Sequence, residues 1–476
     1  MSFFDPLFKS LPLALGLALF LVAVVVLLLM GKVPLRYNVR NLLVRWRITF
    51  LTALAFTLVV GLLTVMLAFV NGMYRLTEAS GEPGNVMILS DGATDELFSN
   101  LSFGDTANIE RQPGVLRDPE RNLPLCSREV YIVVNQPVAV APGQPERRRF
   151  LQVRGIEDAR TSSAVHGIDL YPDDSSWFSE AGVQELPAIN GKASQPAIQA
   201  VLGEGIARIL ADDRKQAETN AGWLQKAAGF VSGTFQRLAG QGDKPTMLHP
   251  GDTFDLGGRT WIVTGISQTA GSTFGSEIWA KRSIVGPLFG KDQITCMVVR
   301  SQDAKEAERL AEDLRTNFRP PVRAEPQTAY YAKLNATNVQ FLYAIVFIAA
   351  IMAIGGVFGV MNTMFAAISQ RTKDIGVLRI LGFARTQILI SFFLETLVIA
   401  MIGGLVGCAL GSLCNGLQAT SILSNGQGGG KTIVFKLIVD ARILGAGLLF
   451  TLVMGALGGL IPALTAMRLR PLESLK

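Results

Sequence analysis

The chain has 476 residues, of which 49% are hydrophobic and only 17% are charged, and its formal net charge is +6. A positive charge balance can indicate a nucleic-acid partner, but most of the excess cations flank long apolar runs, so we expect no nucleic-acid binding. The four cysteines have neither the spacing of a metal site nor the density of a disulfide framework, so we expect no metal in this chain.

Long apolar runs are the dominant feature of the chain. About 20 apolar residues match a hydrocarbon core of about 30 Å, and runs of that length predict five spanning helices, at 11–30, 48–70, 341–368, 388–413 and 443–464. The first run could be a cleaved signal peptide. Its apolar part is too long for that, and no small-residue cleavage pattern follows Met30, so we expect the helix to be retained.

Cations in the short connections predict the orientation of these helices, because they concentrate on the cytoplasmic side. Three connections are rich in them: Lys32, Arg36, Arg40, Arg45 and Arg47; then Arg371, Lys373, Arg379 and Arg385; then Arg468, Arg470 and Lys476. All three should be cytoplasmic, which places the N-terminus and the long segment 71–340 outside and makes the chain a multi-pass inner-membrane protein.

The expected organisation follows from these runs and their orientation. The sequence predicts an integral membrane α-helical bundle with a large extracytoplasmic α+β domain. Its parts are an extra N-terminal transmembrane helix 1–31, a cytoplasmic lead-in and transmembrane helix 32–70, the outer domain 71–340, a transmembrane helix 341–368, a cytoplasmic segment 369–387, a transmembrane helix 388–413, an extracytoplasmic connection 414–442, and a transmembrane helix with a cytoplasmic tail 443–476.

The outer segment has the composition of a globular domain. Alternating apolar residues predict strands at 85–89, 130–134, 149–156 and 293–300, a hairpin over 251–266, and helices at 197–210 and 304–318. A polar stretch near 211–250 resembles an insertion into the domain, and the sequence does not indicate its role. His166 and His249 accompany no hydrolytic motif, so we interpret them as surface or packed residues. One bridge between Cys126 and Cys296 is left open.

The segment 370–382 is compact, basic and enclosed by two apolar runs. Helical spacing predicts that Ile375, Leu378 and Leu381 lie near one face, while Arg371, Lys373 and Arg379 stay available to solvent, lipid phosphate or protein. The segment could be gripped by a soluble protein at the membrane surface. The simpler alternative is a basic loop that lies on lipid headgroups.

Small residues at four-residue spacing predict close contacts between spanning helices, within one subunit or across a dimer. They are Gly355 and Gly359; Gly403, Gly407 and Gly411; and Gly455 and Gly459. An acidic residue, Glu395, lies inside the fourth span, where an ionised carboxylate is costly. No partner at similar depth is evident for a proton relay, so we expect it to anchor the helix near the inner interface.

The stretch 426–432 ends in Gly-Lys-Thr, as phosphate-binding loops do. It lacks the required first glycine, because Asn425 stands there, and its expected location is outside the cytoplasm. We interpret it as a flexible connection and expect no ATPase and no catalytic residue in this chain.

Four separated segments resemble the MacB/FtsX/LolC-type permeases of ABC transport systems. Residues 369–383 are similar to the family's Arg-(Thr/Arg)-x-Glu-Ile-Gly-x-x-(Arg/Lys)-x-x-Gly pattern, with Asp374 in place of the usual Glu, and 458–475 are similar to its closing Gly-x-x-Pro-Ala pattern. Residues 41–52 resemble the lead into the family's first span, and 201–207 resemble part of its outer domain. The helix at 11–30 departs from the family's four-span pattern.

The resemblance implies a mechanotransmission subunit that is not an enzyme. A separate cytoplasmic ATPase dimer would bind ATP and Mg, and this chain would hold no cofactor. The residues expected at the ATPase contact are Arg371, Lys373, Asp374, Ile375, Gly376, Leu378, Arg379, Leu381 and Gly382.

Other partners are implied as well. A second copy or a related permease should pair with this chain, and a periplasmic adaptor or outer-membrane partner would serve export of a substrate from the outer face of the inner membrane. One alternative is an FtsX-like signalling subunit that activates a cell-wall hydrolase without transport. Another is a membrane-anchored receptor or scaffold with no ATPase.

Overall fold

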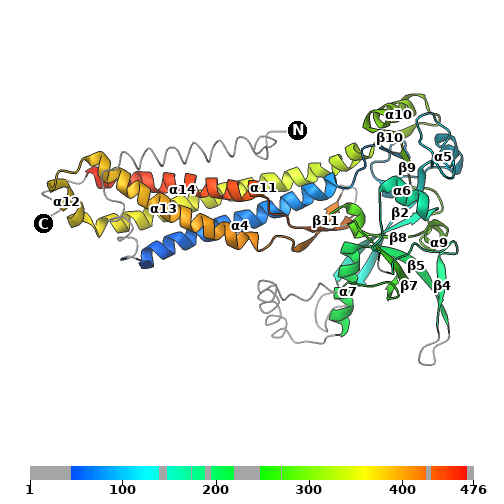
Figure 1. Cartoon of the computed structure of the whole chain (residues 1–476), viewed down its shortest axis with the longest axis horizontal. Coiled ribbons are helices and arrows are strands. Elements are labelled where there is room, and N and C mark those ends of the chain that lie inside the picture. The colour runs from blue at the N-terminus through cyan, green and yellow to red at the C-terminus, as the bar shows by residue number, and fades with distance from the viewer. Residues whose placement is uncertain are drawn as a thin grey trace. The chain divides into compact units, whose positions relative to one another are not determined.

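The computed structural model describes residues 44, 46–138, 147–172, 174–187, 194–218, 247–269, 271–424 and 430–468 (Figure 1). These residues form two compact units, each described by itself. A helical unit comprises Met1–Asn71, Val339–Leu417 and Leu437–Lys476, and a sheet unit comprises Gly72–Asn338 and Gln418–Lys436. The predicted helix at 11–30 and most of the polar stretch near 211–250 lie outside the described residues.

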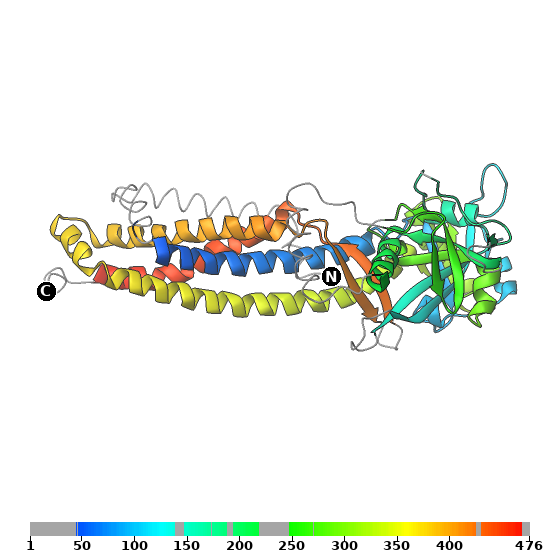
Figure 2. The ribbon, with the colours of Figure 1, turned by 90° about the horizontal axis from the view of Figure 1, so that it is seen from below.

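The helical unit is a bundle of long apolar helices, which lie side by side in both views of the ribbon (Figures 1 and 2). They are α4 (Trp46–Glu78), α11 (Gln327–Ser369), α13 (Arg385–Ser412) and α14 (Ala441–Arg468). Within the described residues, four segments are long and apolar enough to cross a membrane: Thr49–Leu76, Leu342–Ser369, Arg385–Ser412 and Ala441–Met467. Four of the five predicted spans therefore correspond to helices of sufficient length.

Glycines let α13 pack closely on α4. A Cβ atom at Gly403 would lie 2.6 Å from the Ala53 carbonyl oxygen, and one at Gly407 would lie 2.8 Å from the Thr57 carbonyl oxygen. The Thr57 hydroxyl also donates a hydrogen bond of 3.1 Å to the Gly403 carbonyl. Only glycine allows backbones to approach this closely, so these small residues fix the α4–α13 contact.

Other glycines of the bundle differ in their surroundings. Gly411 lies against Thr64 of α4, and Gly455 and Gly459 of α14 lie against α13. A Cβ atom at Gly355 or Gly359 of α11 would meet no atom of the described chain within 4 Å. The seven glycines thus share a spacing but not an environment.

The sheet unit is built on a 10-stranded sheet of strand order β10-β1-β9-β2-β3-β8-β5-β7-β6, with β4 paired to β5. The β3–β8 and β5–β7 pairs are parallel and the other pairs are antiparallel. The strands are β1 (Asn85–Ser90), β2 (Cys126–Val138), β3 (Arg147–Ile156), β4 (Val183–Leu186), β5 (Gln195–Gly203), β6 (Thr253–Leu256), β7 (Arg259–Ser267), β8 (Glu277–Lys281), β9 (Cys296–Arg300) and β10 (Val322–Pro326).

Short helices cover this sheet. The apolar stripe of α10 packs against β1, β9 and β10 through Ala307, Leu310, Ala311 and Leu314. Among the described residues, the short helices of the unit are η1 (Glu96–Phe98), α5 (Phe103–Ile109), α6 (Ala159–His166), α7 (Glu204–Glu218), η2 (Thr273–Ser276), α9 (Arg282–Leu288) and α10 (Ala304–Asn317). Strands and helices of this kind agree with the expected mixed architecture.

One predicted helix of the outer domain, 197–210, is confirmed only in its second half. Residues 197–203, expected to begin a helix, belong to strand β5, and the helix α7 starts only at Glu204. Strand β5 lies between β7 and β8, and most of its residues are buried. A strand that is buried on both faces loses the alternation of apolar and polar residues, so its sequence cannot be distinguished from a buried helical segment.

The extracytoplasmic connection also differs from expectation. The expected flexible stretch enters a two-stranded hairpin of β11 (Gln418–Ser424) and β12 (Gly430–Lys436), so at least 430–432 are ordered strand. These paired strands were not predicted from the sequence, because the glycine run in this connection is typical of a flexible loop.

The Cys126–Cys296 bridge does not form, since both cysteines are free and buried. In the β2–β9 register Cys126 lies opposite Val299, and Cys296 lies opposite Glu129. Three residues along a strand are about 10 Å, which is beyond the reach of a disulfide.

Candidate functional site

The basic segment between α11 and α13 folds into a short helix, α12 (Thr372–Ile380). Its C-terminus is closed by Gly382 in the left-handed region, with φ +93°. The N–H of Phe383 donates to the Leu378 carbonyl and the N–H of Gly382 donates to the Arg379 carbonyl, each at 3.2 Å. This glycine-terminated closure satisfies the last carbonyls of the helix, and a residue with a side chain would be strained at Gly382.

One side of α12 is held against the bundle by Ile375. Its side chain is 1% exposed and belongs to an apolar cluster that includes Ile368 of α11, Ile388 and Phe392 of α13, and Ala463 of α14. The next residue, Gly376, is buried as well. Ile375 is therefore part of the bundle's packing and is not accessible to another protein.

Arg371 stands in the turn before α12 and pairs with Glu395 of α13. Its Nη1 lies 2.7 Å from Glu395 Oε2 and its Nη2 lies 2.9 Å from Oε1, and each residue is 4% exposed. The guanidinium also lies over the ring of Phe392, at 5.7 Å from the centroid. Such a bidentate, desolvated ion pair fixes both the distance between the two side chains and their relative orientation.

This geometry corrects two expectations. Arg371 is not available to solvent or lipid phosphate, because Glu395 neutralises it inside the bundle. Glu395 has a partner after all, supplied from the turn before α12, which a scan for other charges within the spans could not find.

The opposite side of α12 is exposed, and we call it the α12 outer face. It comprises Lys373, Asp374, Val377, Ile380 and Leu381, which follow the three- and four-residue spacing of one helix face. Val377, Ile380 and Leu381 are 47%, 62% and 69% exposed. Three large apolar side chains with charges beside them form a surface suited to a protein groove.

The expected face of Ile375, Leu378 and Leu381 was therefore wrong. Ile375 is buried, Leu378 is half-buried and Leu381 is exposed. Each three-residue step falls short of a full turn by about 60°, so residues six apart lie far from one another around the helix. Arg379 is half-buried, and its Nη1 donates to the Phe383 carbonyl at 3.3 Å.

The sheet unit contains a second notable site, a buried cluster around Arg154. Its guanidinium lies 2.7 Å from Glu277 and 3.2 Å from Glu96, and it also contacts Glu129; all four side chains are buried. Burial alone would lower the pKa of Arg154, but the carboxylates, Glu277 first, raise it well above its usual value. Arg154 is therefore a permanent cation.

The cluster continues toward the first residue of α11. His166 Nε2 lies 2.5 Å from Glu129 Oε1, and Gln327 lies 3.4 Å from the other ring nitrogen of His166. Burial would raise the pKa of Glu129, but His166 and then Arg154 hold it well below its usual value. His166 is thus one of the packed residues that we expected, although its charged neighbours were not foreseen.

Glu96, Glu129 and Cys296 could each offer a metal ligand, since their ligand atoms lie within 4.8 Å of one another. Arg154 Nη1 already contacts all three, at 3.7 Å from the Cys296 sulfur. Burial, together with Glu129 and Glu96, raises the pKa of the Cys296 thiol well above its usual value. The guanidinium takes the place that a cation would occupy, and the residues do not fit a metal.

Comparison with known proteins gives a family match for the C-terminal part. Residues 346–471 match the family described as FtsX-like permease C-terminal. The chain is 31% identical to the macrolide export ATP-binding/permease protein MacB of Nitrobacter winogradskyi over 232 residues, 45% of this chain and 33% of that protein. It is 33% identical to the uncharacterized ABC transporter permease YknZ of Bacillus subtilis over 129 residues, 27% of this chain and 30% of that protein. The chain thus spans about a third of the length of these curated relatives.

Two solved structures also match the chain. The extracellular domain of the YknZ transporter has a TM-score of 0.29 at 12% identity, covering 51% of this chain and 99% of that domain. The periplasmic region of MacB from Actinobacillus actinomycetemcomitans has a TM-score of 0.30 at 12% identity, covering 54% of this chain and 94% of that region.

Proposed function

We propose that the chain is the non-catalytic membrane subunit of an ATP-driven complex in the inner membrane, of the MacB/FtsX type of ABC permease to which its C-terminal part is similar. A separate cytoplasmic ATPase dimer binds ATP and Mg, contacts the α12 outer face, and moves the spanning helices. The movement reshapes the outer domain and exports or releases a substrate at the outer face of the membrane. A second copy or a related permease completes the complex, and a periplasmic adaptor or outer-membrane protein receives the substrate.

The α12 outer face is the observation that carries this proposal. It combines exposed apolar side chains with a helix whose other side is fixed by Ile375 and by the Arg371–Glu395 pair. A force applied to such a helix displaces the bundle rather than bending a loop. A segment that only rested on lipid headgroups would not need a buried ion pair to hold its orientation.

Purification of the chain in mild detergent, followed by an ATPase assay, tests the proposal. Val377→Asp and Leu381→Asp place a charge on the α12 outer face and should abolish co-purification of the ATPase. Val183→Asp is a matched control, because Val183 of β4 is 42% exposed, close to the 47% of Val377. Retained ATPase activity in both α12 variants would contradict the proposed contact.

The FtsX-like alternative uses the same contact and differs at the outer domain. Under that alternative ATP turnover activates a cell-wall hydrolase, and no substrate crosses or leaves the membrane. Reconstituted complexes separate the two: ATP-dependent release of substrate supports export, and ATP-dependent hydrolase activity without release supports signalling.

A further inference from the structure

Gln327, the first residue of α11, joins three segments of the sheet unit through its side-chain amide. Its Oε1 accepts hydrogen bonds from the backbone N–H of Glu82, at 3.1 Å, and from Asn85 Nδ2, at 2.9 Å. Its Nε2 lies 3.4 Å from His166 Nδ1. Gln327 and Asn85 are fully buried and His166 is 4% exposed, so bulk water does not compete for these bonds. The amide therefore holds the start of α11 to the segment between α4 and β1 and to the end of α6.

The direction of each hydrogen bond is fixed by backbone groups that have only one role. The Glu82 N–H can only donate, so the oxygen of the Gln327 amide must face it. Asn85 Nδ2 also donates to the Val165 carbonyl at 2.8 Å, and turning the Asn85 amide over would lose that bond. Gln327 Nε2 is thus the group that faces His166 Nδ1, and this ring nitrogen must act as the acceptor.

The other ring nitrogen of His166 carries the proton. Its Nε2 lies 2.5 Å from Glu129 Oε1, and Arg154 contacts the same carboxylate. A guanidinium beside a carboxylate favours the ionised form, so Glu129 accepts and the imidazole Nε2–H donates. The hydrogen bonds on both sides of the ring are therefore those of a neutral imidazole with a single proton.

Charged side chains surround His166, either against the ring or one contact away. Carboxylates outnumber guanidinium groups among them, so the surroundings favour a second proton on the ring, and the donor of Gln327 opposes it. The thiol of Cys296, 3.5 Å from Glu129 Oε2, stays uncharged, because burial, with Glu129 and Glu96, raises its pKa. The charged groups are Glu129 of β2, Arg154 of β3, Glu96 of η1, Glu277 of β8, Arg300 of β9 and Glu82 before β1.

A second proton on His166 is incompatible with this network. With both ring nitrogens protonated, the Nδ1–H would point at the N–H groups of Gln327, and two donors would face each other. Turning the Gln327 amide over would offer its oxygen to the ring, but would point its NH₂ group at the Glu82 N–H and at Asn85 Nδ2. No orientation of the amide therefore serves a charged His166 and the Glu82 N–H together.

We propose that His166 is a pH-sensitive switch: with one proton on its ring it holds Gln327 against the segment between α4 and β1, and with two protons it releases Gln327. The segments that Gln327 joins are closely packed, since a Cβ atom at Gly81 would lie 2.9 Å from Thr328 Cα. Imidazole is the side chain that ordinarily changes charge between about pH 5 and about pH 8. The inference goes beyond the proposed function, because it requires neither the ATPase contact nor transport of a substrate.

Hydrogen exchange followed by mass spectrometry measures this release in the full chain purified in detergent. Peptides that cover 79–88 and 327–335 are compared at about pH 7.5 and about pH 5.5, after correction for the intrinsic pH dependence of amide exchange. Exchange of these peptides should be about tenfold faster at the lower pH, because a buried hydrogen bond is lost. Equal protection at both pH values would overturn the proposal.

Three variants test whether His166 causes the response. His166→Gln cannot titrate but retains one donor and one acceptor, so its protection should be the same at both pH values. Gln327→Glu provides a carboxylate that accepts from the Glu82 N–H and from a doubly protonated ring, so the junction should stay protected at the lower pH. His249→Gln is the matched control, because it changes the chain's other histidine, which is exposed, and it should respond as the wild type does.

A wild-type response in His166→Gln or in Gln327→Glu would overturn the proposal, and so would loss of the response in His249→Gln. Gln327→Glu decides by itself if His166→Gln does not fold. A residue that only packed in the core would change the protection of these peptides without changing its dependence on pH.

Discussion

Arg371 and Glu395 are 24 residues apart in sequence, yet their side chains form two parallel hydrogen bonds inside the helical unit. The pair ties the turn before α12 to the middle of α13. Glu395→Gln should leave the Arg371 charge buried without a counterion, which typically costs about 3–5 kcal/mol. Thermal unfolding of the full chain in detergent measures this loss.

A double variant provides the control for that prediction. Arg371→Met with Glu395→Leu replaces both charges by apolar side chains, so it should be more stable than Glu395→Gln alone. Equal loss in the single and double variants would mean that the pair's charge is not what stabilises the turn.

The two sides of α12 should respond differently to the same substitution. Ile375→Ala opens a cavity in the bundle and should reduce the free energy of unfolding by about 2–4 kcal/mol, whereas Ile380→Ala should change it by less than about 0.5 kcal/mol. The reason is exposure: Ile375 is 1% exposed and Ile380 is 62% exposed. Comparable losses in chemical unfolding of the two variants would disprove this assignment of the faces.

The effect of a glycine-to-alanine substitution on stability should depend on whether the glycine packs against another helix. Gly407→Ala places a methyl group 2.8 Å from the Thr57 carbonyl oxygen and should destabilise the α4–α13 contact by about 1–3 kcal/mol. Gly355→Ala meets open space within the described chain, so it should be neutral or stabilise α11 by up to about 1 kcal/mol. Melting temperatures in one detergent give the comparison, and a loss in Gly355→Ala would show that this face is covered in the purified protein.

The buried cluster should make the sheet unit sensitive to acid. The pKa of Glu129 is lower in the folded chain than its ordinary value of 4.5, so its contribution to stability is complete above that pH and is lost as pH falls below it. Glu129→Gln should therefore be less stable than wild type at pH 7, with a smaller further loss below pH 4.5. Unfolding followed by tryptophan fluorescence between neutral and acidic pH measures both slopes, and parallel slopes would contradict the assignment.

The sequence predicts the apolar helices well because burial in a bilayer demands long uninterrupted runs. It predicts the exposed side of α12 poorly, because apolar side chains are distributed around the whole circumference of this nine-residue helix. The packing of Ile375 against the other helices decides which side is buried. The spacing of apolar residues in the sequence cannot show which side of the helix is buried.

The Arg154 cluster could not have been found from the sequence. Glu129, Arg154 and Glu277 lie on three neighbouring strands, β2, β3 and β8, and Glu96 lies on the short helix η1, which precedes all three strands in the chain. Only the register brings them together, since Tyr131 faces Arg154 and Gln152 faces Glu277. Each of these residues in isolation resembles an ordinary surface charge.

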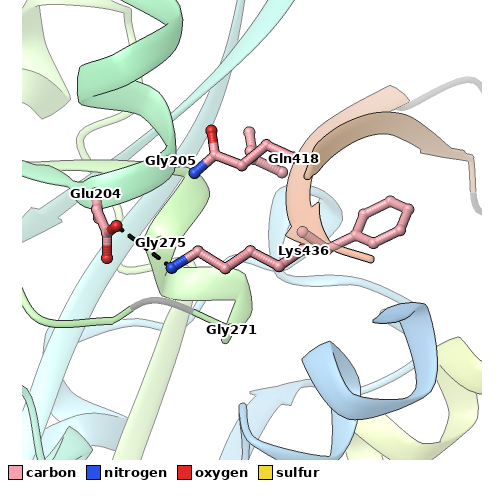
Figure 3. A pocket seen from close by; sticks show the side chains of 8 residues that line it. Glu204, Gly205, Gly271, Gly275, Gln418 and Lys436 are labelled. Carbon is pink, nitrogen blue, oxygen red and sulfur yellow. Dashed lines mark ion pairs between the residues drawn. The ribbon is translucent and has the colours of Figure 1, made fainter. Parts of the chain in front are cut away.

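The place of the β11–β12 hairpin in the sheet unit also has a consequence for biogenesis. Residues 418–436 are synthesised after α11 and α13, so the sheet unit acquires its last two strands only once those helices have emerged from the ribosome. A fragment of 72–338 would lack them and would expose Gly205 and the Glu204 carboxylate, which contact Val434 and Lys436 of β12 (Figure 3). Folding of the sheet unit is thus complete only after α11 and α13 have been synthesised.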